Sequence, residues 1–453
     1  MTTTRFDRFD VVVTMDAGRR EIGGGSVLVE DRSIVAVGEP DETWPSPDRV
    51  IDGRDKILLP GMVNTHHHFY QTLFRNVPGA ADKELFDWLT FLYERWKRID
   101  PDAVRVSASI ACSELLLSGA TTSSDHFYVF PEDHPDIFDA EIEGATRTGI
   151  RFHPCRGSMS LSKKDGGLPP DSVVQDEDTI LADCQRVIER YHDRDPSAMV
   201  RVAIAPCSPF SVTDDLMRAS TSLADEYGVL LHTHLAETED EEAFCLASRG
   251  ARPVDLMEEL GWLRDDAWFA HVVHVSDDDI GKLGAAGAGM SHCPSSNMAL
   301  GSGISPIRRL ADAGVHVSLA VDGSASNDSS NMIREVRQAM LLQRVGVGAD
   351  ALSARDSLFL ATRGGAEVLG RDDRIGSIEP GKAADLIAFD LHDIAFAGAR
   401  TDPVAAIVHC AADRVSLAMV DGTLRVEEGR LLDGDLDALI RRQNEISERL
   451  NRR

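Results

Sequence analysis

Eight short apolar segments alternate with helical stretches through most of this chain, and the alternation limits the folds that it can adopt. Strands that alternate with helices predict βαβ units and a parallel sheet. The candidate strands are residues 62–65, 121–125, 151–156, 200–205, 229–234, 268–271, 289–293 and 315–322. Helical periodicity is found between them, for example over residues 103–117, 177–192, 214–227 and 329–342. Eight such units in about 300 residues match the size of a (β/α)8 TIM barrel, an α/β fold.

The two ends of the chain show a different pattern. Each end has three short segments rich in β-branched residues, separated by turn-forming residues. These segments are residues 11–15, 26–30, 34–37, 384–389, 415–420 and 423–427. Neither end has enough strands for a stable sheet alone, so we expect residues 1–60 and 375–453 to form one small β-sandwich domain beside a barrel of residues 61–374. The periodicity of residues 436–453 predicts a C-terminal helix.

The composition excludes several classes of protein. Hydrophobic residues make up 43% of the chain, enough for a large core, and acidic residues outnumber basic ones by 75 to 47. A surface with a formal net charge of −28 repels phosphate backbones and anionic lipids, so we expect no nucleic-acid or membrane partner. No segment has the roughly eighteen apolar residues of a membrane span. The seven cysteines are scattered and contain no CxxC pair, which indicates reduced thiols and a cytoplasmic protein.

Candidate metal ligands follow the ends of several predicted strands, at the face where a barrel builds its active site. His66 and His68 end the first strand, and side chains two apart on a strand share a face. His234 ends the fifth strand and is a possible third ligand. Asp322 follows the eighth strand, where a metal would compensate the cost of burying a carboxylate. A histidine pair at the polar rim of the barrel would have the same local sequence.

Two further residues have the chemistry of proton transfer. Glu237 lies three residues after His234, so it can reach a metal-activated water without binding the metal. His271 closes an apolar strand, where a lone histidine is often a hydrogen-bonded core residue. The four acids at residues 239–242 are interpreted as a solvated helix start. Each of these residues alone could be structural. Candidates at the ends of four separate predicted strands, however, are hard to explain by packing.

The motifs around these residues resemble those of the amidohydrolase superfamily, in its branch of aminohydrolases and deaminases that act on aromatic heterocycles. The resemblance covers nearly the whole chain and rests on PGMVNTHHH, HTHLAE, the histidine of the sixth strand, VDGSASND and IGSIEPGKAADLIAFD. It implies one divalent metal ion, Zn²⁺ with Fe²⁺ as the alternative. The implied ligands are His66, His68, His234 and Asp322.

The resemblance also implies a mechanism, in which a metal-activated water attacks the amino-bearing carbon of a ring. Glu237 would carry a proton to the adjacent ring nitrogen, His271 would polarise the attack, and Asp322 would help to protonate the departing amine. Binuclear members of the superfamily use a carboxylated lysine after the fourth strand. Here that strand ends in IAPCSPFSV, and no lysine occurs between Lys164 and Lys282. A single metal ion is therefore expected.

The loop sequences indicate the substrate class. CRGSMSLSKKDGGLPP, SHCPSSNMALGSGI and VDGSASNDSSNM resemble most closely the members of this branch that convert 8-oxoguanine to urate and ammonia. Deamination of guanine, isoxanthopterin or another pterin, and amino- or chlorohydrolysis of an s-triazine, remain open alternatives. So does a non-catalytic metal-binding scaffold, although no ligand or acid is missing. The family also suggests a homo-oligomer.

Several side chains beyond the strand ends are candidate contacts for the substrate. They are Tyr70, Gln71, Arg156, Cys207, Phe210 and His292, with Asn297 completing the rim. The Gln71 amide can both donate to and accept from a lactam edge, and Arg156 can donate to an oxo group. A structural Arg156 paired with an acid such as Asp125, and a core Phe210, fit the sequence equally well. Trp88, Phe91 and Trp96 predict either a helical lid or ordinary helix packing.

Overall fold

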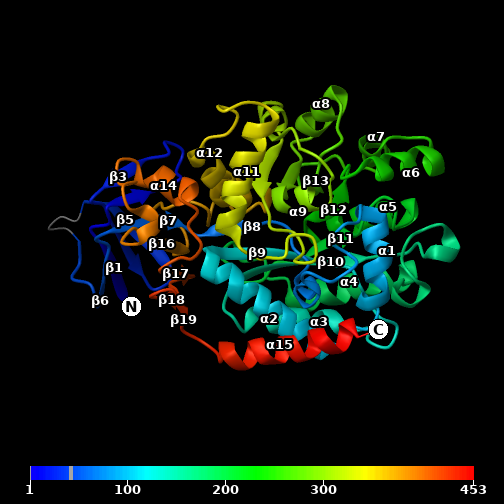
Figure 1. Ribbon diagram of the computed structural model, residues 1–453, viewed down its shortest axis with the longest axis horizontal. Coiled ribbons are helices and arrows are strands. Elements are labelled where there is room, and N and C mark those ends of the chain that lie inside the picture. The colour runs from blue at the N-terminus through cyan, green and yellow to red at the C-terminus, as the bar shows by residue number, and fades with distance from the viewer. Residues whose placement is uncertain (1, 40–43, 453) are drawn as a thin grey trace.

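A parallel sheet of eight strands forms the centre of the larger part of the molecule in the computed structural model, which describes residues 2–39 and 44–452 (Figure 1). The strands follow one another around the sheet in chain order, each parallel to the next. They are β8 (Met62–Asn64), β9 (Ala120–Phe127), β10 (Arg151–Ser158), β11 (Ala203–Pro206), β12 (Leu231–Leu235), β13 (Ala267–His271), β14 (Gly289–His292) and β15 (His316–Leu319). The predicted barrel of eight βα units is confirmed.

The first and last strands meet through side chains and loop backbone rather than through a regular ladder. The backbone N–H of Val321 donates to Oδ1 of Asn64 at 2.9 Å, and the N–H of Asp322 donates to the carbonyl of His66 at 3.2 Å. For this reason β15 is shorter than the apolar run at residues 315–322 that predicted it. The same contacts place Asp322 directly beside the end of β8.

Helices surround the barrel, and local sequence explains where they begin and end. Asp100 accepts a hydrogen bond from the N–H of Ala103, Pro101 occupies the first turn, and Gly119 ends α2 in the left-handed conformation. The barrel helices are α1 (Leu85–Trp96), α2 (Pro101–Ser118), α3 (Ile137–Thr146), α4 (Glu177–Tyr191), α5 (Asp214–Tyr227), α6 (Glu239–Arg249), α7 (Pro253–Glu259), α8 (Asp277–Ala285), α9 (Pro294–Ala299), α10 (Ile307–Asp312), α11 (Met332–Gly346), α12 (Ala354–Phe359) and α13 (Gly365–Val368).

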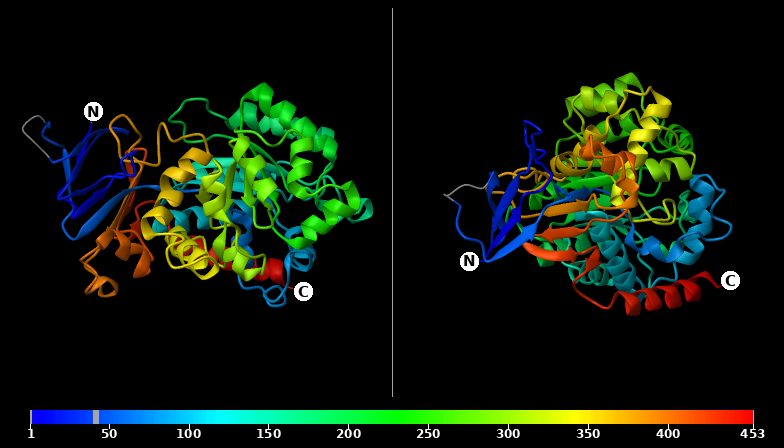
Figure 2. Two further views of the ribbon diagram at one scale, coloured as in Figure 1. Left: turned by 90° about the horizontal axis from the view of Figure 1, so that it is seen from above. Right: turned by 60° about the vertical axis from the view of Figure 1, so that its left-hand side comes forward.

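Strands from both ends of the chain form two further sheets, visible in blue and orange beside the barrel (Figure 2). One sheet has the order β5-β4-β1-β6, and the other β19-β18-β17-β16-β7-β2-β3. Their strands are β1 (Thr3–Asp7), β2 (Val11–Val13), β3 (Glu21–Gly23), β4 (Ser26–Glu30), β5 (Ser33–Gly38), β6 (Arg49–Asp52), β7 (Lys56–Pro60), β16 (Leu386–Asp390), β17 (Leu417–Val420), β18 (Thr423–Glu427) and β19 (Arg430–Leu431). Antiparallel pairing of β7 with β16 joins the two ends.

The two sheets share one core, as a β-sandwich requires. Phe6 and Val27 of the smaller sheet pack in one cluster with Val12, Leu58 and Leu386 of the larger sheet. This arrangement agrees with the predicted sandwich of N- and C-terminal segments. The division into domains at residues 60 and 375 stays a prediction.

The C-terminal helix α15 (Leu436–Asn451) lies along the barrel beside α2 (Figure 1). Its Gln443 donates to the hydroxyl of Thr72, and its Ser447 donates to the carbonyl of Leu73. Both acceptors belong to the short 3-10 helix η1 (Phe69–Phe74), which follows His68 directly. The end of the chain therefore supports the segment that carries the first two candidate metal ligands. The remaining helix, α14 (Pro403–His409), lies between β16 and β17 in the sequence.

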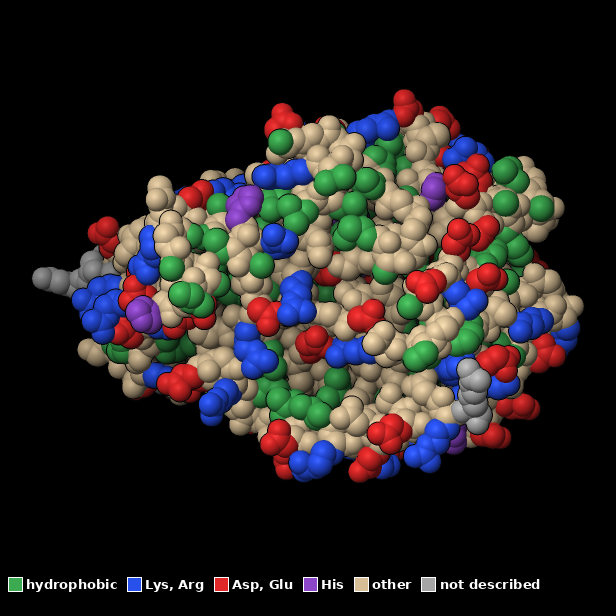
Figure 3. Space-filling model, in the orientation of Figure 1, with side chains coloured by type: hydrophobic (Ala, Val, Ile, Leu, Met, Phe, Trp, Pro, Cys, Tyr) green, Lys and Arg blue, Asp and Glu red, His purple; other side chains and the backbone are tan. Residues whose placement is uncertain are grey.

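Acidic and basic side chains are interspersed over the face shown in Figure 3. Many of them form ion pairs, such as that between Arg355 and Glu21. Within residues 2–39 and 44–452, no helix is both long and apolar enough to cross a membrane.

Candidate metal centre and active site

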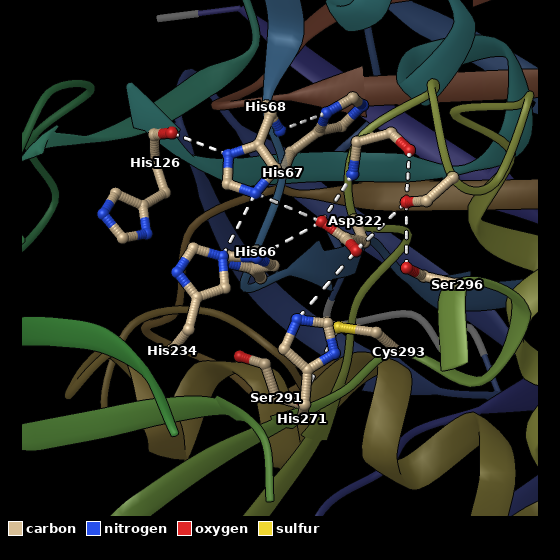
Figure 4. A network of polar contacts seen from close by, with 12 residues as sticks. His66, His67, His68, His126, His234, His271, Ser291, Cys293, Ser296 and Asp322 are labelled. Carbon is tan, nitrogen blue, oxygen red and sulfur yellow. Dashed lines mark hydrogen bonds and ion pairs between the residues drawn. The ribbon is translucent and has the colours of Figure 1, made fainter. Parts of the chain in front are cut away.

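The predicted metal ligands meet at the C-terminal ends of the barrel strands (Figure 4). His66 and His68 follow β8, His234 lies in β12, and Asp322 follows β15. Oδ1 of Asp322 is 3.3 Å from Nε2 of His66 and 3.3 Å from Nε2 of His68. Nε2 of His234 is 3.3 Å from Nε2 of His68. Three strands thus bring these four residues together: the ligand atoms of His66, His68 and Asp322 all lie within 4.8 Å of one another, and His66 and His234 belong to a second such group with His271.

Hydrogen bonds fix the orientation of all three imidazoles. Nδ1 of His68 donates to the carbonyl of His126 at 2.7 Å, and Nδ1 of His234 donates to the carbonyl of Cys207 at 2.5 Å. Because a carbonyl only accepts, Nδ1 carries the hydrogen in both rings, and Nε2 presents a lone pair to the centre.

His66 is oriented through a second histidine. Nδ1 of His232 donates to the carbonyl of Trp268 at 2.9 Å, so Nε2 of His232 accepts from Nδ1 of His66 at 2.8 Å. The His232 ring also stacks on the Trp268 indole, with ring centroids 4.2 Å apart. Nε2 of His66 is buried and has no hydrogen-bond partner among the described residues.

Three lone pairs and a carboxylate oxygen therefore converge with no hydrogen between them. Such a group of acceptors is repulsive unless a cation lies among them, and imidazole with carboxylate suits a divalent transition metal. These histidine and aspartate side chains therefore fit a metal ion. The thiol of Cys207 is not a suitable ligand, because burial raises its pKa to about 12 and keeps it neutral.

Asp322 is held in a strained conformation at this centre. Its φ of 59° lies in the left-handed region, which costs a non-glycine residue about 1–3 kcal/mol. Burial raises the pKa of Asp322, but hydrogen bonds donated by His66 and His68, when a proton rather than a metal ion lies between them, outweigh burial and hold the pKa well below its ordinary value. The carboxylate is therefore ionised, as a ligand must be.

Glu237 lies beside the centre without joining the converging atoms. Its carboxylate is buried and is 3.6 Å from Nε2 of His271. Burial raises the pKa of Glu237, while the nearby His271 lowers it and Asp322 raises it further. An acid with a raised pKa next to a metal site is suited to proton transfer.

Glu241 corrects the interpretation of residues 239–242 as a solvated helix start. Its carboxylate is fully buried and accepts the N–H groups of Ala236 and Glu237 at 2.8 and 2.9 Å. Burial raises the pKa of Glu241 to about 7. Glu239 and Asp240 are exposed, as predicted. Glu241 thus fixes the turn that carries Glu237, with Ala236 at a φ of 51°.

His271 ends β13 with its imidazole directed into the site. Its backbone is in the left-handed region, at a φ of 75°. Nδ1 of His271 donates to Oδ1 of Asn297 at 2.8 Å, which leaves Nε2 facing Glu237 and, at 4.0 Å, Asp322. His271 is therefore a buried, hydrogen-bonded residue of the core whose second ring nitrogen faces Glu237.

The cavity above the centre is small and largely covered by α1. Its volume is about 30 Å³, room for one or two water molecules. Gln71, Cys207 and Phe210, three predicted contacts, line it together with Trp88 of α1. Gln71 is packed against the loop after Asp322, where a Cβ on Gly323 would lie 2.0 Å from its Oε1. A bicyclic ring can enter only when the α1 side chains move.

Comparison with known proteins agrees with this geometry. Residues 57–425 match the model of the Amidohydrolase family. The chain belongs to the amidohydrolase family. It is 48% identical to an 8-oxoguanine deaminase of Pseudomonas aeruginosa, over 93% of this chain and 94% of that protein. It is 36% identical to a hydroxydechloroatrazine ethylaminohydrolase of Pseudomonas sp. strain ADP, over 89% of this chain and 86% of that protein.

A solved amidohydrolase structure extends the comparison to three dimensions. The crystal structure of an atrazine chlorohydrolase from Arthrobacter aurescens TC1, complexed with zinc, superposes with a TM-score of 0.93 at 34% identity. The superposition covers 99% of this chain and 100% of that chain. The barrel and the β-sandwich predicted for this amidohydrolase therefore occur together in a known structure.

Arg156 is the clearest departure from the predicted substrate contacts. Its side chain is fully buried away from the cavity, with Nε donating to Asp183 at 2.8 Å and Nη2 donating to Gln175 at 2.9 Å. Its guanidinium also lies 3.7 Å above the ring of Phe130. The structural alternative fits this environment, with Asp183 as the paired acid in place of Asp125.

Tyr70 and His292 are also outside the lining of the cavity. Tyr70 packs edge-on against Trp96 at 5.4 Å, and Tyr128 takes its place beside the His68 ring. His292 is fully buried at the end of β14, and burial lowers its pKa to about 3, so it is neutral. Neither of its ring nitrogens has a hydrogen-bond partner among the described residues.

Only one of the three aromatic residues of α1 named above reaches the cavity, and a lid role for it stays a prediction. Trp88 lines the cavity, whereas Trp96 packs beneath it and Phe91 contacts the guanidinium of Arg95. Phe210 lines the cavity and also packs against Phe86, at 4.9 Å.

His232 was assigned no role from the sequence. It stands two residues before His234, so the period of a strand places it on the same face, one layer deeper in the barrel. From this spacing, His232 could have been predicted to support His234 or another candidate ligand.

Proposed function

We propose that the chain is a metal-dependent aminohydrolase that converts 8-oxoguanine and water to urate and ammonia. The observation that carries the proposal is the convergence of three imidazole lone pairs and a carboxylate next to a buried acid, Glu237, that is not among them. The choice of ring is supported by the 48% identity to a protein that deaminates 8-oxoguanine.

We assign one divalent ion to His66, His68, His234 and Asp322, with Zn²⁺ as the ion. Zn²⁺ is supported by the donor set and by the zinc in the atrazine chlorohydrolase structure; the same donors also suit Fe²⁺. When bound, such an ion supplies Lewis-acid chemistry that makes water a nucleophile near neutral pH.

The protein's own groups then move the protons. The Glu237 carboxylate takes a proton from the attacking water and delivers it to the ring nitrogen beside the amino-bearing carbon. Nε2 of His271 holds the water by a hydrogen bond, since its Nδ1 is already bound to Asn297. Asp322 assists protonation of the departing amine. General acid–base steps of this kind contribute about 10²–10⁴-fold in rate.

Ring recognition is assigned to the cavity residues Gln71, Cys207 and Phe210. The Gln71 amide can pair with a lactam edge in both directions, and Phe210 offers an apolar surface to the ring. Trp88 and the rest of α1 exclude bulk water once the ring is bound, which strengthens the polar contacts within.

Ammonia release from a panel of rings tests the proposal. The zinc-loaded protein is assayed with 8-oxoguanine, guanine, isoxanthopterin and an amino-s-triazine, with Glu237→Gln as the matched inactive control. We expect the highest kcat/KM with 8-oxoguanine and urate as the product. A higher kcat/KM with another ring would reassign the substrate and keep the chemistry. Full metal content without ammonia from any ring would favour a metal-binding scaffold.

We also propose a homo-oligomer, as the family resemblance suggests. Light scattering coupled to size-exclusion chromatography measures the mass directly. A mass equal to that of one chain at micromolar concentration would contradict this proposal.

A further inference from the structure

A second cavity lies at the opposite end of the barrel from the candidate metal centre. Its volume is about 290 Å³, and its lining includes His153, Arg194, Arg201 and Leu230. His153 is the third residue of β10, and Leu230 directly precedes β12. The cavity is therefore at the N-terminal ends of the strands, whereas His234 stands near the C-terminal end of β12.

His153 is buried in the barrel interior and lines this cavity without a partner. Only 1% of its surface is exposed, and neither ring nitrogen has a hydrogen-bond partner among the described residues. Its ring is 5.8 Å from the indole of Trp268, edge-on. A buried polar ring left unpaired costs free energy, which points to a ligand that completes its hydrogen bonds.

Arg371 adds a buried positive charge behind the same cavity. It directly follows Leu369 and Gly370, which line the cavity, and it is 1% exposed. Nη2 donates to the carbonyl of Ala198, but Nε and Nη1 have no hydrogen-bond partner among the described residues. No carboxylate in the described part of the chain forms an ion pair with it, in contrast to Arg151 nearby, which pairs with Asp385 at 3.0 Å.

The arginines around this cavity lower one another's pKa. Burial, and then Arg151 and Arg201, lower the pKa of Arg371 to about 9. Burial lowers the pKa of Arg201 as well, and Asp373, Asp193 and Asp195 oppose this shift from a distance. Nε of Arg201 is also buried without a partner. Nη2 of Arg201 donates to the carbonyl of Asp195 at 3.1 Å, so Nε is its unpaired donor at this site.

We propose that this cavity is a binding site for an oxyanion of phosphate size, held by His153 and Arg201 at the cavity wall, with Arg371 supplying buried positive charge behind them. Planar guanidinium groups are suited to phosphate oxygens, and an anion would add a direct charge partner near Arg371, which forms no ion pair with a carboxylate in the described part of the chain. The anion is either free phosphate or the phosphate group of a monoester. The site is independent of the proposed deaminase chemistry at the other end of the barrel.

Binding is measured on the metal-loaded full chain by isothermal titration calorimetry and by thermal melting. Inorganic phosphate is titrated against chloride at equal ionic strength, and ribose 5-phosphate is titrated separately. We expect one phosphate per chain and a saturable rise in Tm of about 2–4 °C at a hundredfold excess over Kd. Tighter binding of the ester would identify the monoester as the ligand, and equal or weaker binding would identify free phosphate.

Arg201→Gln and Arg371→Gln are the informative variants, with Arg308→Gln on the exposed face of α10 as the matched control. We expect both informative variants to lose at least tenfold in phosphate affinity, while Arg308→Gln keeps it. Ammonia release by Arg201→Gln should be unchanged, so failure of this site is separable from failure of the proposed function. Absence of saturable phosphate binding in the wild type, or unchanged affinity in both variants, would overturn the proposal.

Discussion

His271 donates its Nδ1 hydrogen to Oδ1 of Asn297 over 2.8 Å, and this bond determines which nitrogen of His271 faces the cavity. Asn297 lies in α9, and its side chain is fully buried. His271 cannot turn over without leaving this acceptor unpaired. The helix after β14 thereby orients a residue at the end of β13.

Replacing Asn297 with Leu should lower activity without removing metal. Leu has nearly the same size but no acceptor, so the His271 ring can adopt the wrong tautomer. Loss of such an orienting partner costs about ten- to a hundredfold in activity. Asn297→Asp keeps the acceptor and should recover most of kcat. Equal kcat in the wild type and in Asn297→Leu would show that His271 needs no orienting partner.

Metal content should distinguish a ligand from the residue that orients it. We expect His234→Ala to lose most bound metal, because it removes one of four converging atoms. His232→Phe keeps the ring stacked on Trp268 but cannot accept from His66, so metal affinity should fall by about ten- to a hundredfold. Elemental analysis and chelator competition measure both effects, with His316→Ala, at the exposed first residue of β15, as the control. Full metal in His234→Ala would contradict the assignment.

Glu237→Gln should separate proton transfer from metal binding. The amide fills the same space but cannot carry a proton, so we expect normal metal content and a rate lowered by about 10²–10⁴-fold. Steady-state ammonia release and elemental analysis on the same preparation test this. Near-normal turnover would remove Glu237 from the mechanism.

The barrel could be predicted from the sequence because its signal is local. Each strand segment is followed by a stretch with helical periodicity, so all eight βα units are visible one at a time. The closure between β8 and β15 could not be predicted, because it depends on Asn64 meeting Val321, and His66 meeting Asp322, across about 250 residues. The strands β1, β6 and β7 were missed for a related reason, since each pairs with a strand that is distant in the sequence. The strands β3 and β19 were missed too, because they are only three and two residues long.

The candidate site was predictable where residue type alone indicates chemistry. Histidines and acids at strand ends identify the metal centre, but a strand-end arginine such as Arg156 has the same local sequence whether it faces the cavity or pairs with an acid. Glu241 was misjudged because its partners are two backbone N–H groups. These groups point toward it only after the chain turns at Ala236.

Stability should fall between pH 6 and pH 8 because of buried Glu335. Burial raises its pKa from 4.5 to about 7, although Ser295 and Asn327 donate to it. Between these pH values the folded protein holds a proton that the unfolded chain has released. The free energy of unfolding therefore decreases as pH rises through 7, by about 1 kcal/mol from pH 6 to pH 8 for this group. Urea denaturation at the two pH values measures the change.

Glu335→Gln should reduce this pH dependence by about the same amount, because the amide does not titrate. Exposed Glu259 on α7 provides the matched control, and Glu259→Gln should leave the dependence unchanged. An identical slope in the wild type and in Glu335→Gln would show that Glu335 is already ionised at pH 6.

Arg156→Ala should weaken the fold and leave the choice of ring unchanged. The substitution removes the hydrogen bonds to Asp183 and Gln175 and leaves two half-buried acceptors, so we expect a loss of about 2–4 kcal/mol in the free energy of unfolding. Asp183 keeps a second partner in Arg186, at 2.7 Å, which limits the loss. Denaturant unfolding measures it.

The catalytic consequence separates the two interpretations of Arg156. A structural arginine predicts that kcat/KM for 8-oxoguanine and for guanine changes by the same factor, whereas a contact with the 8-oxo group predicts a selective loss on 8-oxoguanine. Arg190→Ala, which removes an ion pair between exposed Arg190 of α4 and Asp139 of α3, is the control for general destabilisation. Unchanged stability with a tenfold selective loss on 8-oxoguanine would show that Arg156 reaches the bound ring. We expect the opposite, because the Arg156 guanidinium already pairs with Asp183 and lies over the ring of Phe130.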